Sequence, residues 1–117
     1  MAHKHSRPTP NGRYVWYVER LWQLAQHLPI KSVPIENIAE FDQNCWFDDS
    51  TPPTCRAVAA HVKRIYEADL SYPIILSAEG YLMDGGHRIG KAWLLGMKEI
   101  QAVQFEIDPE SDEVRPE

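Results

Sequence analysis

The sequence has no long apolar run and few cysteines, and each absence excludes a class of protein. No stretch approaches the roughly 18 apolar residues that a membrane-spanning helix needs. The first residues also lack the apolar segment of a secretory signal peptide, so a cytoplasmic location is the default expectation. The only two cysteines, Cys45 and Cys55, have neither CxxC nor metal-ligand spacing. We therefore expect two free thiols that serve ordinary packing.

An excess of basic residues is absent as well. The formal net charge is −5, whereas proteins that bind nucleic acid usually carry clustered lysine and arginine. The charge argues against a nucleic-acid partner, although a local basic pocket is compatible with it. A chain of 117 residues with 44% hydrophobic residues suits one domain with a single core.

The ends of the chain differ in composition from its middle. Residues 1–12 are polar and contain two prolines, which predicts a disordered N-terminal arm. Residues 108–117 are acidic and contain proline, which predicts a flexible tail. The sequence therefore predicts a single domain over residues 13–107.

Three segments have apolar residues at helical spacing. Residues 14–28 form the first and end at Pro29. Its aromatic side chains favour a helix that covers a sheet, and a partner-binding or dimer surface is the alternative. The second helix follows a cap at Ser50 or Thr51. Its predicted buried stripe consists of Cys55, Val58, Ala59, Val62, Ile65 and Tyr66.

The third helix, residues 87–95, directs Ile89, Ala92 and Trp93 toward the core and ends at Gly96. Strands are predicted at residues 31–38, 72–76, 81–83 and 98–107, the first of them at a sheet edge because it contains Pro34. The loop at 39–49 is anchored by Trp46 and Phe47. Together these elements predict an α/β (α+β) domain, a small mixed sheet with packed helices and an extra N-terminal helix.

The candidate site is the turn between the strand at 81–83 and the third helix. Gly85 and Gly86 permit a sharp turn and close approach to a ligand. His87 and Arg88 follow in the first helical turn, where backbone N–H groups lack helical partners and the helix dipole favours an anion. The arginine adds a fork of donors suited to phosphate. Lys91, one helical turn further on, completes the predicted phosphate-binding or nucleotide-binding set.

Each of these residues also has a structural interpretation. His87 can bond a backbone carbonyl, Arg88 can form an ion pair with Asp84, and Lys91 can point to water. Asp84 is a candidate ligand for the Mg²⁺ that nucleotide phosphates bring, or equally a helix cap. No catalytic residue is assigned; Glu36 is the speculative general base, and a solvated strand residue is its simpler interpretation.

Residues 35–105 resemble the ParB/sulfiredoxin superfamily, whose ParB N-terminal-like domain has a comparable order of elements. Three parts carry the resemblance. The first is Phe47-Asp48 with the helix at 57–65, where the family has a short helix that leads to an apolar strand. The others are Tyr72-Pro-Ile-Ile-Leu76, similar to the "P-I-x-V" strand of the family, and the run from Tyr81 to Val103. That run contains Asp84-Gly-Gly-His-Arg88, similar to the family's "D-G-x-H-R" turn before a helix. The resemblance implies the fold and a turn that holds nucleotide phosphates. Members include CTP-hydrolysing clamps, ATP-using sulfinic acid reductases, kinases of free serine and reported nucleases.

The sequence departs from two of these subgroups. Sulfiredoxins have a cysteine where this chain has Gly86, so the redox nucleophile is missing. The segregation clamps continue into a helix-turn-helix domain and a dimerisation domain, whereas this sequence stops at residue 117. We therefore expect a stand-alone ParB-like domain that binds a nucleotide or other phosphate ligand at Gly85–Arg88, with NTP hydrolysis or phosphoryl transfer as accompanying reactions.

Two other functions compete with this one, and whether the chain is an enzyme stays open. The first is a non-catalytic protein-interaction module, which would use the aromatic N-terminal helix for a homodimer or another protein partner. The second is a DNA-binding protein or nuclease, which rests on family analogy alone.

Overall fold

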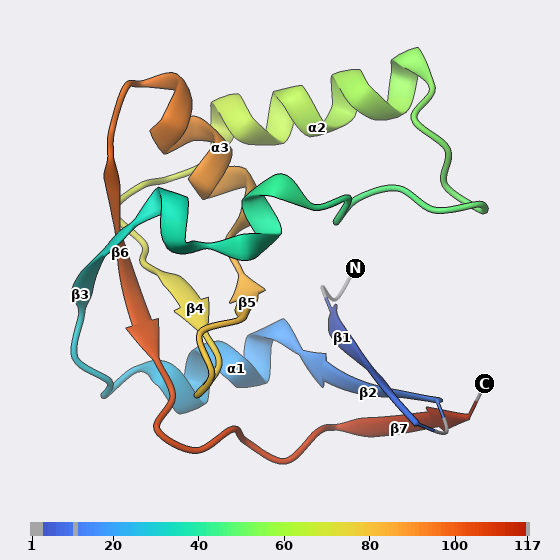
Figure 1. Ribbon diagram of the computed structural model, residues 1–117, viewed down its shortest axis with the longest axis vertical. Helices are drawn as coiled ribbons and strands as arrows, with labels where there is room; N and C mark the ends of the chain where they lie inside the picture. Colours follow the sequence, from blue (N-terminus) through green and yellow to red (C-terminus); the bar gives the residue numbers. More distant parts are fainter. Residues whose placement is uncertain (1–3, 11, 117) are drawn as a thin grey trace.

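A four-stranded mixed sheet forms the centre of the computed structural model, which describes residues 4–10 and 12–116 (Figure 1). Its strand order is β3-β6-β4-β5, with β3 at Lys31–Pro34, β4 at Ile74–Leu76, β5 at Leu82–Asp84 and β6 at Glu99–Gln104. β4 and β6 are parallel, and both edge strands are antiparallel to their neighbours. All three residues of β4 are buried, as its apolar sequence predicts.

Helices cover both faces of this sheet. Successive side chains of a strand point to opposite faces, so Ile75 packs with Leu21 of α1 (Val18–Ala25), while Ile74 and Leu76 pack with α3 (Gly86–Leu94). Two short 3₁₀ helices, η1 (Ile35–Asn37) and η2 (Ala39–Asp42), complete the α3 side. The two resulting cores meet at the sheet.

The third helix follows the prediction at most positions. Ile89 and Ala92 are buried, and Gly96 has the positive φ of 79° expected at the end of a helix. The prediction for Trp93 is wrong: its side chain is 58% exposed and packs beside Phe41, with 6.1 Å between the ring centroids.

The second helix departs further from its prediction. α2 spans Cys55–Glu67, and its cap is Thr54, whose side chain accepts a hydrogen bond from the N–H of Ala57. The predicted caps, Ser50 and Thr51, instead donate to Asp48 in the preceding loop.

No residue of α2 is buried, so the predicted buried stripe is wrong. The helix touches the rest of the fold along one narrow side. There Ile65 lies against Gly90 of α3, where a Cβ atom would come within 3.4 Å of the isoleucine side chain. The apolar stripe therefore lies outside the core, although its helical spacing predicted a buried face.

A second, three-stranded sheet contains both ends of the described chain and corrects two predictions. β1 (Lys4–Thr9) and β7 (Glu113–Pro116) flank β2 (Gly12–Tyr17) in antiparallel pairs. The expected disordered arm is thus a strand from residue 4 to residue 9, and the expected flexible tail pairs with the sheet. Residues 1–3, 11 and 117, on which the same predictions fall, lie outside the described part.

Specific bonds hold this sheet to the domain. The indole of Trp16, 3% exposed, donates to the carbonyl of Pro109 over 2.9 Å, and Asp112 accepts from the N–H of Tyr17 over 2.7 Å. Because β2 takes residues up to Tyr17, α1 begins later than the predicted helix at residue 14. Within the described chain, no helix has the length and apolarity needed to cross a membrane.

Candidate functional site

The predicted turn joins β5 to α3. Glycine is the only residue that fits at the first position of this turn. Gly85 has a φ of 124°, and a Cβ atom there would lie 2.4 Å from a methyl carbon of Ile74. Gly85 is also the N-cap residue and supplies no side-chain hydrogen bond to the helix. The N–H groups of Gly86 and His87 therefore begin α3 without an acceptor in the described part of the chain.

Trp46 lies over this helix start. It comes from the loop between η2 and α2, and a Cβ atom on Gly86 would be 3.4 Å from its indole nitrogen. Among the described residues, no hydrogen bond occupies that indole N–H. A second type of donor is thus placed beside the open N–H groups of α3.

Two histidines lie beneath the same indole. Nδ1 of His61 is 2.8 Å from Nε2 of His87, and the two rings are nearly coplanar, with 13° between their planes. Trp46 is parallel to both imidazoles at centroid distances of 4.6 and 4.7 Å, and Phe47 meets His61 edge-on at 5.3 Å. The two loop residues predicted as anchors therefore pack on this histidine pair.

The histidine pair is neutral around pH 7. Burial, and next the neighbouring His61, lowers the pKa of His87 to about 4. Burial, with a contribution from Arg64, also lowers the pKa of His61. One imidazole donates to the other, so the pair can exchange a proton between α2 and α3 and offer the outer ring nitrogens to a ligand.

Arg88 forms the ion pair with Asp84 that its structural interpretation predicts. Its Nη2 donates to Oδ2 of Asp84 over 2.9 Å, and the same oxygen accepts from the indole N–H of Trp22 over 2.9 Å. The guanidinium lies over the Trp22 ring at 5.4 Å, and its buried Nε has no partner in the described residues. These contacts tie α1, β5 and α3 together at the turn.

Lys91 does not reach the turn. Its ammonium group donates to the carbonyls of Tyr66 and Ala68 over 2.9 and 2.7 Å, at the carboxyl end of α2. A cation at this position satisfies carbonyls that have no helical partner. The structure thus gives this lysine a place in helix capping and separates it from Gly85–Arg88.

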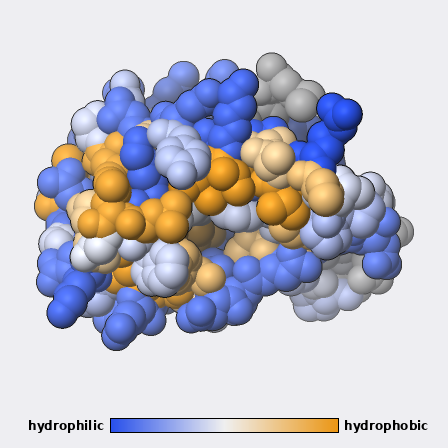
Figure 2. All heavy atoms as spheres, turned by 90° about the horizontal axis from the view of Figure 1, so that it is seen from above, coloured by the Kyte–Doolittle hydropathy of each residue, from blue (hydrophilic) through white to orange (hydrophobic). Residues whose placement is uncertain are grey.

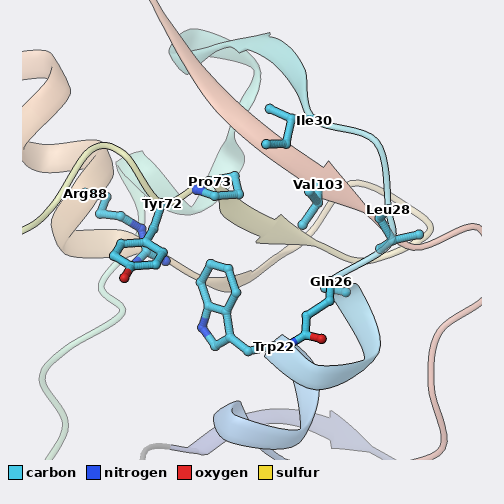
Figure 3. A pocket seen from close by; sticks show the side chains of 9 residues that line it. Trp22, Gln26, Leu28, Ile30, Tyr72, Pro73, Arg88 and Val103 are labelled. Atoms are coloured by element: carbon cyan, nitrogen blue, oxygen red, sulfur yellow. The ribbon is translucent and has the colours of Figure 1, made fainter.

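A pocket of about 610 Å³ opens on the other side of Arg88. Figure 3 shows Trp22, Tyr72 and Arg88 close to one another on one side of the pocket, with Pro73, Val103 and Leu28 farther along its lining. The rings of Trp22 and Tyr72 meet edge to face, with 6.1 Å between their centroids. The pocket is mainly apolar with one cationic group, which suits a ring that carries a negative charge.

Sequence reasoning did not assign these pocket residues to a site. Trp22 was assigned to a covering helix and Tyr72 to a strand, and nothing in the spacing of the two residues brings them together. His61, which contacts His87, is likewise absent from the predicted site. The one available signal was the density of aromatic residues around residue 22.

The other candidate groups are not gathered at the turn. In the part of the chain that is described, no three histidine, cysteine, aspartate or glutamate side chains form a group that could hold a metal ion. Glu36 is exposed on η1. Cys45 and Cys55 are free, as predicted, but both are exposed, so the prediction that they serve packing is wrong.

The chain was compared with protein-family models, with curated proteins and with solved structures. None of the three comparisons finds a match. The resemblance to the ParB/sulfiredoxin superfamily is therefore still an expectation, and function has to be argued from the site.

Proposed function

We propose that this chain is a ParB/sulfiredoxin-like domain that binds a nucleotide or another phosphate-bearing small molecule, with the phosphate at the start of α3. The observation that carries the proposal is the indole N–H of Trp46, which has no acceptor among the described residues, beside the helix start at Gly86, which has no side-chain cap. Backbone N–H groups and the positive end of a helix dipole favour an anion. An additional side-chain donor at the same place increases that preference.

The groups around the helix start have complementary tasks in this proposal. His87 and its partner His61 are neutral, so either outer ring nitrogen can donate to a phosphate oxygen without a counter-ion. Arg88 adds positive charge nearby, although its direct bond goes to Asp84. Gly85 supports the close approach of backbone and ligand.

The pocket beside Arg88 provides a place for the remainder of such a ligand. Its apolar walls and the paired rings of Trp22 and Tyr72 suit a flat ring system. Arg88 contributes both to the first turn of α3 and to the pocket lining, so one ligand can contact the two regions.

Mg²⁺ would accompany a nucleotide. Asp84 is the candidate ligand, and it would use Oδ1 because Oδ2 already accepts bonds from Trp22 and Arg88. Phosphoryl transfer depends on positioning and charge neutralisation more than on a covalent nucleophile. Nucleotide hydrolysis is therefore the reaction to assay once binding is measured.

The alternative function, a protein-interaction module that uses the aromatic N-terminal helix, has less support. Of the aromatic residues in the N-terminal segment, Trp16 is buried and Trp22 is bonded to Asp84. Tyr17 donates to Glu113 over 2.6 Å. These three side chains are used inside the domain, and only Tyr14 of this aromatic set is exposed, at 43%.

Calorimetric titration with ATP, CTP, GTP and inorganic phosphate, each with and without Mg²⁺, tests the proposal. Trp46→Phe keeps the stacked ring and removes the N–H, so we expect about tenfold weaker binding, the value of one hydrogen bond to a charged group. Arg88→Ala should weaken binding at least as much. Lys91→Met is the matched control, since it removes a cation from the same helix away from the turn, and its affinity should equal the wild type.

No heat and no thermal shift with any of these ligands would exclude a phosphate site at the turn, provided that circular dichroism shows a folded chain. Unchanged affinity in Arg88→Ala would place the ligand elsewhere.

A further inference from the structure

Each histidine of the pair between α2 and α3 has one ring nitrogen inside their contact and one outside it. The inner nitrogens are Nδ1 of His61 and Nε2 of His87, which are 2.8 Å apart. The outer nitrogens are Nε2 of His61 and Nδ1 of His87. Neither outer nitrogen has a hydrogen bond to a described residue, and neither is fully buried, since both rings are partly exposed. Both are therefore open to water or to a ligand.

The short contact links the proton positions of the two rings. A separation of 2.8 Å is that of a hydrogen bond, which needs one proton between the inner nitrogens, and a neutral imidazole carries a single ring proton. When His61 donates, the proton of His87 is on its outer nitrogen, and the outer nitrogen of His61 is bare. When His87 donates, the outer proton is on His61 instead. A neutral pair thus presents one outer N–H, either on α3 or on α2.

The surroundings keep this pair neutral around pH 7. The indole of Trp46 stacks on both rings, and Figure 2, seen from the side of α2, shows hydrophobic residues gathered across this face. Burial is the largest cause of the lowered pKa of both histidines. The charged side chains that act on the pair are two cations and one carboxylate: Arg64, Arg88 and Asp84. The single outer N–H is therefore retained at neutral pH.

We propose that a phosphate bound at the start of α3 selects between these two states, and that His61 is the positioning residue that makes His87 a donor to it. This inference rests on the proposed function. His87 also supplies a backbone N–H without an acceptor in the described chain at the same helix start, and ionised phosphate oxygens accept hydrogen bonds. The bound anion therefore favours the state in which Nδ1 of His87 carries the outer proton and Nε2 of His61 is bare.

The change to this state conserves the number of protons. The inner proton moves from Nε2 of His87 to Nδ1 of His61. The outer nitrogen of His61 releases its proton to water, and the outer nitrogen of His87 takes one from water. The bond from His61 to His87 and the bond from His87 to the phosphate then run in the same direction, which strengthens both. Ligand binding on α3 therefore exposes a bare ring nitrogen on α2.

Nitrogen-15 NMR of the full chain, labelled at histidine, tests the inference, because protonated and bare imidazole nitrogens have distinct chemical shifts. At neutral pH without ligand, both states should be populated, since they share the same inner bond, and the two rings should change tautomer together. Inorganic phosphate should shift both rings to the form that is protonated at Nδ1. Opposite tautomers in the two rings would overturn the inference.

Calorimetric titration with phosphate on the same sample separates this inference from the proposed function. Binding of phosphate without a response of the His61 nitrogens overturns the inference and leaves the proposed function intact. No binding of phosphate contradicts both, while the tautomers of the ligand-free chain still decide whether the two rings are linked.

Two substitutions at His61 separate hydrogen bonding from packing. His61→Asn keeps a donor at the place of Nδ1 and loses the ring that stacks on Trp46, whereas His61→Phe keeps a ring and loses the donor. We expect phosphate affinity to stay within about twofold of the wild type in His61→Asn and to fall about tenfold in His61→Phe, the value of one hydrogen bond. The reverse order would assign His61 to packing with Trp46 alone.

His27→Phe is the matched control. This histidine is exposed in the turn after α1, so its replacement should leave the phosphate affinity equal to that of the wild type. Circular dichroism checks that all variants fold. Equal losses of affinity in His27→Phe and His61→Phe would come from the added aromatic surface and would overturn the role of His61.

Discussion

The helices α1 and α2 show how differently two amphipathic segments can be used in one small domain. α1 has eight residues, buries Leu21 and Ala25, and is linked through Trp22 to Asp84. α2 has thirteen residues and buries none. An apolar stripe therefore identifies a helix from sequence, but does not tell whether that stripe faces the core of its own chain.

The largest expected difference between the two helices concerns stability. Leu21 is 1% exposed, and Leu21→Ala should lower the free energy of unfolding by about 2–5 kcal/mol. Val58→Ala on α2 should lower it by less than about 1 kcal/mol, since its surroundings are open to water. Urea unfolding at low protein concentration measures both, and equal losses would contradict the assignment of α2 to the periphery.

The two glycines of the turn differ in the same way: Gly85 is tightly surrounded, and Gly86 has space for a side chain. Gly85→Ala combines a positive φ with a clash against Ile74 and should cost about 2–4 kcal/mol. Gly86→Ala meets only ordinary contacts with the Trp46 ring, and alanine has the higher helix propensity, so we expect stability to change by less than about 1 kcal/mol. Thermal unfolding followed by circular dichroism separates the two, and similar melting temperatures would show that the turn can relax.

The histidine pair makes the contact between α2 and α3 depend on pH. The folded-state pKa of His87, about 4, lies below its ordinary value of 6.5. The neutral ring is therefore favoured by folding, and the unfolded chain binds more protons between these values. Its contribution to stability is complete above pH 6.5 and is lost as the pH falls toward 4.

A variant isolates this contribution from other titrating groups. The half-buried His5 also has its pKa lowered to about 4, chiefly by desolvation, and this effect is common to the wild type and to His87→Gln. Between pH 6.5 and pH 4, the melting temperature should fall more steeply in the wild type than in His87→Gln. Parallel profiles would mean that the pair does not respond to acid.

The smallest expected effect concerns the cap of α2. Thr54→Ala removes the bond to the N–H of Ala57 and should cost about 1 kcal/mol. Because α2 is peripheral, we expect the loss as faster hydrogen exchange in its first turn, with little change in the global melting temperature. Protection lost evenly across the sheet would instead show that α2 unfolds together with the core.

Much of the central sheet and its α3 side could be predicted from sequence. The apolar run at Ile74–Leu76, the core positions Ile89 and Ala92, and the glycine turn all depend on neighbouring residues. Such local patterns report secondary structure and core-facing positions directly.

The second sheet could not be predicted in this way. Val15 pairs with Glu113, and no local pattern indicates a partner so distant in the chain. The polar composition of residues 4–9 also resembles that of a disordered arm. Their order comes from the pairing with β2 instead of from burial of their own side chains.

The site was predicted in part. Sequence located the glycine turn and the helix start, but not the indole of Trp46 above it or the bond from His61 to His87. Lys91 shows what helical periodicity cannot predict. The periodicity places Lys91 one turn from His87, but its ammonium group donates to carbonyls at the carboxyl end of α2.

The central place of β2 between β1 and β7 has a consequence for folding during synthesis. β1 and β2 can pair as soon as both have left the ribosome, whereas the other edge of β2 is unpaired until residue 113 emerges. Such late pairing is slow because a long loop has to close, and an unpaired strand edge is open to other chains in the meantime. The nascent protein thus exposes this sheet edge until residues 113–116 have been made.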